Sequence, residues 1–217
     1  MMASLREMLS AGAGELGLTL APTNIDRLLL LVTELRKWNR VINLTTITSE
    51  QEIIVKHLLD SLTVVPLIPN GARVLDLGSG GGFPGVPLAL VRPDLCVTSV
   101  DATLKKIHFQ RHIVRLLGLA NLNPLHARGE LLAGNHAGRF DVILSRAFSS
   151  LPDFVAPAQP LLASDGIIIA MKGKNGEEEA AATGLFLEKR RLALREVHRL
   201  RLPFSNDQRT LVVISPW

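Results

Sequence analysis

The 217-residue chain has little of several residue types, and each shortage excludes a class of protein. Its single cysteine, Cys96, cannot form an internal disulfide, which fits a reducing compartment. Its longest apolar runs, such as 28–32, fall far short of the roughly 20 residues that a membrane span needs. The N-terminus shows no basic start followed by an apolar stretch, so we expect no signal peptide. We therefore expect a soluble, cytoplasmic protein with no membrane partner.

Metal-ligand spacing is also missing, because the six histidines and the one cysteine form no recognisable ligand pattern. We expect no metal ion. The formal net charge is +4, and it is unevenly spread: residues 1–70 hold six Lys/Arg against seven Asp/Glu, whereas residues 71–217 hold eighteen against thirteen. A basic balance permits nucleic-acid binding without demonstrating it. Any contact with an anion is expected in the C-terminal part.

What is present is a hydrophobic content of 47%, enough for a sizeable core, and two kinds of pattern. Residues 1–70 predict helices: apolar residues from Ile25 to Trp38 recur near a 3.6 period, with Thr23 or Asn24 as the candidate N-cap. A further helix is expected over 49–65. From residue 72, β-rich runs alternate with helical ones at about 85–92, 103–117, 151–162 and 176–190. Strands are expected at 73–78, 96–102, 122–128, 140–147, 166–173, 192–202 and 209–217.

This alternation of strands and helices predicts an α/β fold with a parallel sheet covered on both faces. The last two strands have no helix between them, so they are expected to form a C-terminal antiparallel hairpin. The result is a seven-stranded, mostly parallel sheet. We expect one domain over 71–217 and an N-terminal helical cap over 1–70.

The most informative stretch is VLDLGSGGGFPGVP, residues 74–87, at the end of the first expected strand. Ligands of open α/β sheets bind at the carboxyl ends of the strands, where glycines let the backbone approach them closely. A GxGxxG match at positions 80, 82 and 85 allows a dinucleotide, but that match alone is weak. Asp76 would repel a pyrophosphate and suit an ammonium group. The spacing that fits the first motif of S-adenosylmethionine-dependent methyltransferases is Asp76-x-Gly78-x-Gly80-x-Gly82.

A second carboxylate, Asp101, ends the next strand and is placed to accept the hydroxyls of a ribose. Both S-adenosylmethionine and NAD would need this contact, so Asp101 supports an adenosine without choosing between them. The terminal hairpin favours the methyltransferase. An NAD-dependent oxidoreductase and an inert tight turn are the alternatives.

The absence of two further sequence features reduces the number of candidate methyl acceptors. Methyltransferases of exocyclic amines carry Asn/Asp-Pro-Pro-Tyr/Phe after the fourth strand, but here that segment is SRAFSS, residues 145–150, and the chain has no tyrosine. Cytosine C5 methylation needs a cysteine nucleophile there, and the one cysteine lies on the second strand. An already nucleophilic atom remains, either a ring nitrogen or an oxygen. Guanine N7 fits well, and alignment without a general base would suffice. We assign no catalytic residue and keep Arg146 as the candidate for such a role.

Several segments resemble the glucose-inhibited division protein B family, the bacterial small-subunit rRNA guanine-N7 methyltransferases. The match covers nearly the whole chain. Two departures are Arg40, where lysine is commoner, and Gly129, where a branched residue is usual. The segments that carry the resemblance, besides the glycine loop, are WNRVINLT (38–45), HLLDSL (57–62), LSRAF (144–148), MKG (171–173) and RTLVVI (209–214).

The resemblance implies a class I S-adenosylmethionine-dependent methyltransferase that methylates N7 of a guanine in 16S rRNA (rRNA position 527 in the family). It implies a substrate within the small ribosomal subunit, and we expect a monomer. Another RNA or a small molecule is the alternative substrate, and binding without turnover is a further alternative. The cofactor contacts that the resemblance implies are Gly78, Gly80, Phe83, Asp101, Gly129, Glu130 and Arg146.

For several other side chains, the sequence allows either a functional or a structural role. Arg146 is expected beside the cofactor or RNA, or in an ion pair with Asp60 or Asp141. Trp38 is a core residue or a base-stacking platform, and His57 a structural or a catalytic residue. Asn39 and Asn43 line a pocket or cap a helix end. The candidates for RNA-phosphate contacts, each otherwise a solvated charge, are Lys172, Arg115, Arg199 and Arg201.

Overall fold

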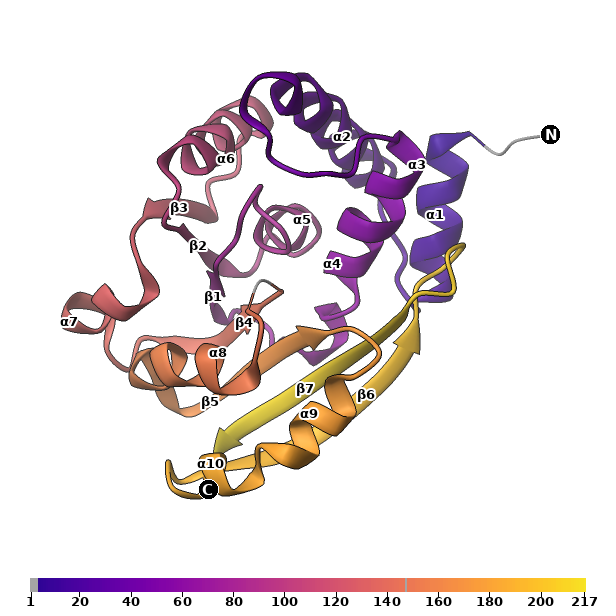
Figure 1. Ribbon diagram of the computed structural model, residues 1–217. Helices are drawn as coiled ribbons and strands as arrows, with labels where there is room; N and C mark the ends of the chain where they lie inside the picture. Colours follow the sequence, from indigo (N-terminus) through magenta and orange to yellow (C-terminus); the bar gives the residue numbers. More distant parts are fainter. Residues whose placement is uncertain (1–3, 147) are drawn as a thin grey trace.

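The computed structural model describes residues 4–146 and 148–217. The strands described there form one seven-stranded sheet in the order β3-β2-β1-β4-β5-β7-β6 (Figure 1). Strands β1 to β5 are parallel, while β7 lies antiparallel between β5 and β6. The predicted sheet and hairpin are confirmed. The strands span β1 Arg73–Leu77, β2 Cys96–Asp101, β3 Leu122–His126, β4 Phe140–Ser145, β5 Leu162–Lys172, β6 Leu192–Arg201 and β7 Gln208–Pro216.

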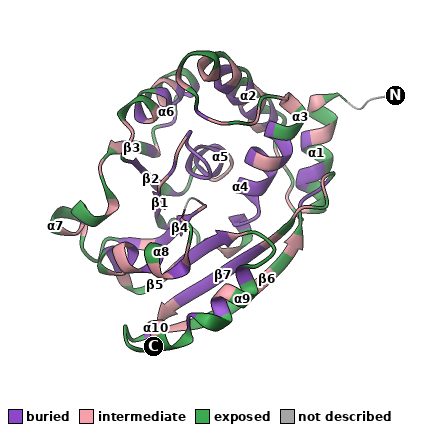
Figure 2. Ribbon diagram, in the orientation of Figure 1, coloured by how far each residue is buried: buried purple, intermediate pink, exposed green. Residues whose placement is uncertain are grey.

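Helices cover both faces of the sheet (Figure 1). Alternate residues of a strand face opposite sides, so Val74 joins the cluster beneath α5 and α6 while Leu75 joins the cluster beneath α8 to α10. Buried residues follow the inner strands and the inner sides of the helices, whereas the edge strand β6 is mostly exposed or half-buried (Figure 2). The helices that follow strands are α5 Gly85–Val91, α6 Leu104–Leu117, η3 Gly129–Leu131, α7 Ala133–His136, α8 Leu151–Ala158, η4 Gln159–Leu161, α9 Gly176–Ala182 and α10 Gly184–Glu188.

The N-terminal helices α1 (Leu5–Glu15) and α2 (Pro22–Ile42) pack on the α5 and α6 side. The prediction of Thr23 or Asn24 as the N-cap of α2 is wrong. The helix begins at Pro22, and its N-cap, Ala21, makes no side-chain hydrogen bond. Proline suits the first helical position because its φ is already helical and its missing N–H would have no partner there.

The helix expected over 49–65 is continuous but irregular. A π-helical segment, η1 (Ile54–Leu59), lies between α3 (Glu50–Ile53) and α4 (Asp60–Leu62), and a 3₁₀ turn, η2 (Val65–Leu67), follows. The expected start of β5 at residue 166 is also wrong, because the strand begins at Leu162. Leu162 pairs with Phe140 of β4. The register then shifts, and regular pairing continues from Val142 with Ile167.

One apolar cluster joins Leu35 of α2 and Leu58 of η1 to Phe109 and Ile113 of α6. The N-terminal helices therefore share a core with the sheet, and the boundary at residue 70 stays a prediction. None of the helices that the structure describes is long and apolar enough to cross a membrane.

Candidate active site

The loop between β1 and α5 lies at the switch point of the sheet, where the chain passes from the β2 side to β4. Gly82 has φ +91°, and a Cβ there would lie 2.5 Å from Cγ2 of Val86, so only glycine fits. A Cβ on Gly80 would meet no described atom within 4 Å, which leaves open space for a ligand above this residue. The loop therefore has no room for a side chain at residue 82 and leaves space for a ligand beside residue 80.

Asp76, on β1, holds this loop through a hydrogen bond to Gly85, the first residue of α5. Its side chain is fully buried, and Oδ2 accepts a hydrogen bond of 2.8 Å from the backbone N–H of Gly85. Oδ1 has no partner among the described residues. Burial raises the pKa of Asp76 to about 7, although the Gly85 hydrogen bond opposes the shift. Asp76 thus ties α5 to β1, and its contact with the ammonium group of a ligand stays a prediction.

Asp101 holds a fixed carboxylate at the end of β2. Oδ2 accepts from the backbone N–H of Gly80 at 2.9 Å, and Oδ1 accepts from the N–H of Thr103 at 2.8 Å. Lys106 of α6 lies 3.9 Å away from Oδ2. Because the carboxylate is only 8% exposed and already oriented, it can accept hydroxyl groups with little further ordering.

Two hollows of about 380 Å³ each meet at Gly78 and Asp101. The loop hollow extends from the glycine loop toward Thr45, His57 and Arg146. The strand hollow extends along the ends of β1, β2 and β3. Together they form an elongated site with a carboxylate at its centre. The predicted cofactor residues that line them are Gly78, Gly80, Phe83, Asp101 and Arg146 in the loop hollow, and Gly78, Asp101, Gly129 and Glu130 in the strand hollow; Asp76 and Gly82 line neither.

Arg146 is the centre of a hydrogen-bonded cluster beside the loop hollow. Its Nη1 donates to the carbonyl of Lys56 at 2.8 Å and to Oδ2 of Asp60 at 3.1 Å. Asp60 is 2% exposed, and its Oδ1 also accepts from Nε of Arg209 at 2.9 Å. Asp60 is therefore one of the two ion-pair partners expected for Arg146, and the same Arg146 faces the loop hollow. The other expected partner, Asp141, pairs with Arg73 instead.

His57 is neutral and has no free ring nitrogen. Nη2 of Arg146 lies 3.1 Å from Nδ1, and a guanidinium can only donate, so Nδ1 accepts. The ring proton is then on Nε2, which lies 2.9 Å from Oγ1 of Thr45. Burial, assisted by the charge of Arg146, lowers the pKa of His57 to about 3. The ring also stacks on Phe83, so the geometry supports the structural interpretation of His57.

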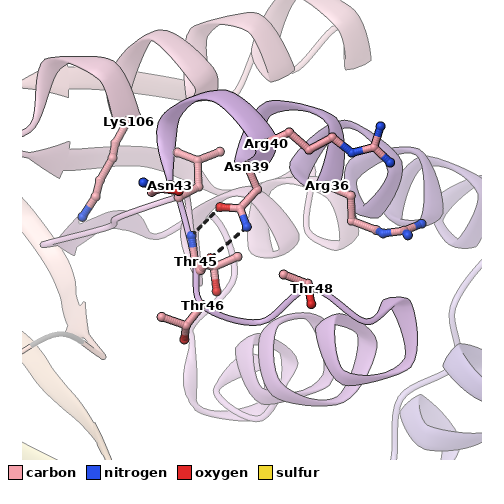
Figure 3. Close-up of a pocket in the computed structure, with 9 residues that line it drawn as sticks. Arg36, Asn39, Arg40, Asn43, Thr45, Thr46, Thr48 and Lys106 are labelled. Atoms are coloured by element: carbon pink, nitrogen blue, oxygen red, sulfur yellow. Dashed lines mark hydrogen bonds between the residues drawn. The ribbon is translucent and has the colours of Figure 1, made fainter.

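The motif WNRVINLT closes one wall of the loop hollow. Asn39 donates from Nδ2 to the carbonyl of Thr45 at 2.8 Å, and its Oδ1 accepts from the N–H of Thr45 at 2.9 Å (Figure 3). Asn43 ends α2 in the left-handed region, with φ 48°. Trp38 packs against Phe109 at a ring distance of 5.6 Å, which supports a core role. Asn39 therefore shapes the loop, and both asparagines line a neighbouring hollow between α2 and α6 rather than the two hollows of the site.

The predicted RNA-contact residues fall in different places. Lys172 is held within 3.0 Å of Glu179 and donates to two loop carbonyls. Arg199 pairs with Glu177 and lines a hollow of about 520 Å³, the hairpin hollow, with Arg201. Arg115 does not join them. Because α6 starts at the site and runs away from it, Arg115 lies about 14 Å farther along the helix than Lys106.

The contact between Arg209 and Asp60 could not be read from the sequence. Arg209 and Asp60 occur in recognisable motifs, but nothing in those motifs indicates that the two side chains meet. Among residues 4–146 and 148–217, no three histidine, cysteine, aspartate or glutamate side chains gather as metal ligands. The expectation of a protein without a metal stays a prediction.

The family model of GidB, rRNA small subunit methyltransferase G, matches residues 24–212 of the chain. The chain belongs to this family. Ribosomal RNA small subunit methyltransferase G of Geobacter metallireducens is 51% identical over 209 residues, covering 96% of this chain and 95% of the relative. That of Neisseria meningitidis serogroup B is 40% identical, covering 97% and 98%. The resemblance seen in the motifs is confirmed.

Solved structures share the fold of this methyltransferase G family member at low sequence identity. A SAM-dependent methyltransferase from Aquifex aeolicus gives a TM-score of 0.57 at 19% identity, covering 71% of this chain and 89% of that chain. M. jannaschii TYW2 in complex with AdoMet gives 0.60 at 15% identity, covering 74% and 76%. The predicted fold of the S-adenosylmethionine-dependent methyltransferases is thereby confirmed.

Proposed function

We propose that the chain transfers a methyl group from S-adenosylmethionine to N7 of a guanine in 16S rRNA. The observation that carries this proposal is the elongated site around Asp101 in a chain of the rRNA small subunit methyltransferase G family. The similarity to the Geobacter relative covers 96% of this chain and 95% of that relative. We further propose that it acts as a monomer in the cytoplasm, on rRNA within the small ribosomal subunit.

The site fits the cofactor in shape and in chemistry. Asp101 lies at the centre, where it can accept both ribose hydroxyls, and Gly129 and Glu130 line the far end of the strand hollow, where an adenine can bond. Gly78, Gly80 and Arg146 line the loop hollow, which leaves the amino-acid end for that side. When bound, the cofactor supplies an electrophilic methyl group on a sulfonium.

Guanine N7 matches the residues around the loop hollow because its lone pair is free at neutral pH. No proton has to be removed, so no base is needed. His57 is neutral with both ring nitrogens engaged, and it holds Arg146 rather than accepting a proton. The chain then contributes alignment, which keeps the two reacting atoms about 3–3.5 Å apart.

The N-terminal helices are proposed to act as a cap on the methyltransferase domain of residues 71–217. Their contribution is the segment after α2, since Leu44, Thr45 and Thr46 all line the loop hollow. A cap of this kind excludes water from the cofactor and gives the target base a wall to lie against. Because a paired guanine in an A-form RNA helix presents N7 only in the deep, narrow major groove, the guanine must be unstacked or already splayed to enter the site.

The test is methyl incorporation from labelled S-adenosylmethionine into unmodified small ribosomal subunits, with free 16S rRNA and tRNA as parallel substrates. The RNA is digested, and the labelled nucleoside is identified. We expect label in N7-methylguanosine from the small-subunit RNA alone. Label in tRNA would contradict the proposed substrate, and label in another nucleoside would contradict the proposed target atom. S-adenosylmethionine binding without labelling would leave the cofactor site and remove the proposed reaction.

A further inference from the structure

A hollow of about 730 Å³ lies beside the proposed active site, between the end of α2 and the start of α6. Three cations line this helix hollow: Arg36 and Arg40 from α2, and Lys106 from α6. The side chains of Arg36 and Arg40 extend to one side of Asn43, and Lys106 lies on the other (Figure 3). The lining that the structure describes includes no carboxylate. The helix hollow is therefore a basic site that the proposed cofactor contacts do not use.

The helix hollow is continuous with the loop hollow. The two share Leu44, Thr45, Thr46 and Lys106 as lining residues. A ligand that enters the loop hollow from solvent can thus extend into the helix hollow without crossing a wall. This continuity gives room for a ligand larger than a single base or a free ion.

The charges in the helix hollow differ in how far they are already paired. Arg36 binds Glu50, and Lys106 lies 3.9 Å from Asp101. Arg40 is exposed and has no hydrogen-bond or ion-pair partner among the described residues. Its guanidinium can take a bidentate anion without giving up an existing partner. Arg40 is therefore the residue with most to gain from an incoming phosphate.

The polar side chains around Arg40 suit the same ligand. Asn43 is exposed at the helix end, and Thr46 and Thr48 present hydroxyls at the rim. Amide and hydroxyl groups can donate to the acceptor oxygens of a phosphodiester. A cluster of one unpaired guanidinium, one loosely paired ammonium and several neutral donors is the composition expected of a backbone contact to a nucleic acid.

Cations also lie on the opposite side of the loop hollow. A hollow of about 360 Å³, the arginine hollow, shares His57 and Arg146 with the loop hollow and is lined by Lys172 and Arg209. Through Arg209 it continues to the hairpin hollow. The RNA-contact residues expected from the sequence lie on this side, apart from Arg115. The helix hollow supplies the missing cationic arm on the other side of the cofactor site.

We propose that the helix hollow binds a backbone phosphate of the RNA strand that carries the target guanine, with Arg40 as the main contact and Lys106 as the second. The proposal rests on the proposed function and adds to it a defined path for the RNA. Holding the strand on both sides of the splayed base offsets part of the cost of unstacking it. The competing occupant is the carboxylate of the cofactor, which could reach Lys106 from the loop hollow.

The test compares Arg40→Gln with Lys37→Gln. Lys37 lies on the same helix, its side chain is 72% exposed, and it does not line the helix hollow. Both variants remove one positive charge from α2. The dissociation constant for unmodified small ribosomal subunits is measured over a range of salt concentrations, and the affinity for S-adenosylhomocysteine is measured by calorimetry. Methyl transfer by the wild-type chain is recorded in parallel.

We expect Arg40→Gln to weaken RNA binding about five-fold and to reduce the slope of log affinity against log salt by about 0.7–0.9. Lys37→Gln should change neither value by more than about a third of this, and both variants should keep the S-adenosylhomocysteine affinity. A double Lys106→Gln, Arg40→Gln variant should lose a further part of the slope.

Three results would overturn the phosphate site. These are equal RNA affinities and salt slopes in Arg40→Gln and Lys37→Gln, a loss of S-adenosylhomocysteine affinity in Arg40→Gln at unchanged RNA affinity, and a wild-type chain that does not bind the subunit. Failure of the proposed function would give a different experimental result. A wild-type chain that binds the subunit but does not label its RNA removes the reaction, while the comparison of the two variants still decides the phosphate site.

Discussion

The glycine loop and the Arg146 cluster lie at the same edge of the sheet, yet the chain builds them in different ways. The loop is held by contacts of short to moderate sequence separation: the Gly85 to Asp76 hydrogen bond spans nine positions, and the Gly80 to Asp101 hydrogen bond spans 21. The cluster joins Arg146 to Asp60 over 86 positions and Arg209 to Asp60 over 149. The hydrogen bonds of the glycine loop therefore fall within residues 76–110, whereas the cationic cluster joins residues from both ends of the chain.

The two regions also treat a buried carboxylate differently. Asp76 has a backbone N–H and no cation within hydrogen-bond reach, and burial raises its pKa to about 7. Asp60 is equally buried but accepts from two guanidinium groups. The loop thus depends on backbone shape, and the cluster depends on charge. Substitutions that change either the backbone shape of the glycine loop or the charge of the Arg146 cluster test this difference.

The largest effect is expected from Asp60→Asn. The change removes the shared anion of two arginines that are only 24% and 22% exposed, and leaves both facing a neutral amide. Breaking a buried ion pair in this way costs about 3–5 kcal/mol of unfolding free energy, and we expect the lower end because the arginines keep some solvent. Urea denaturation monitored by circular dichroism measures the change.

Asp141→Asn is the matched control, since it also removes the partner of an arginine. Both side chains of the Arg73–Asp141 pair are solvent-exposed. Water can therefore solvate the Arg73 guanidinium when it loses its partner. Its destabilisation should be several-fold smaller. Equal losses in the two variants would mean that the cluster is no more than a surface ion pair, and the contrast with the loop would disappear.

The next largest effect is expected from Gly82→Ala. The new Cβ would lie 2.5 Å from Val86 at a residue with φ +91°, so either the loop or α5 must move. We expect a loss of about 1–3 kcal/mol in stability and a clear loss of S-adenosylhomocysteine affinity. Gly81→Ala is the control in the same loop, because Gly81 has no positive φ and its nearest contact would be 3.4 Å. Similar losses in both variants would refute the shape argument.

A smaller effect, on pH dependence, is expected from His57→Gln. The folded-state pKa of about 3 lies below the ordinary value of 6.5, so the unfolded chain takes up a proton first as the pH falls. His57 therefore contributes stability above pH 6.5, and part of it is lost below. Between about pH 7.5 and about pH 5.5 the loss is about 1.4 kcal/mol. Asp76 shifts in the opposite direction over this range, so the wild-type curve alone is not diagnostic.

The measurement is urea denaturation of wild type and His57→Gln at both pH values. The stability difference between them should shrink by about 1.4 kcal/mol at the lower pH. His108→Gln, which changes an exposed histidine on α6, should follow the wild type at both values. A difference that stays constant with pH would mean that the folded chain leaves the pKa of His57 at its ordinary value.

The sequence predicts the features of this molecule that depend on near neighbours. The alternation of short strands and helices is local, and so are the glycine spacing and the terminal hairpin, and all of these appear in the structure. The start of β5 was missed because it depends on the pairing of Leu162 with Phe140. The N-cap of α2 was missed because polar side chains at 23 and 24 outweighed the preference of Pro22 for the first turn.

The cationic half of the site was predicted less well, for the same reason. Arg146 was recognised, but its link through Asp60 to Arg209 depends on the closure of β7 against β5. The basic C-terminal part was expected to hold the RNA, whereas Arg40 of the N-terminal helices lines the larger hollow. Charge counted along the chain does not show which cations a fold brings together or which carboxylates neutralise them.

The most direct test of the division between the two halves is the separate measurement of cofactor and RNA affinity in Asp101→Asn and Arg209→Gln. Asp101 lines the loop hollow and the strand hollow, whereas Arg209 lines the arginine hollow and the hairpin hollow. We predict that Asp101→Asn weakens S-adenosylhomocysteine binding about ten-fold or more and keeps the affinity for small subunits. Arg209→Gln should do the reverse. Loss of cofactor affinity in Arg209→Gln equal to that in Asp101→Asn would contradict the account, because the two halves would then act as one site.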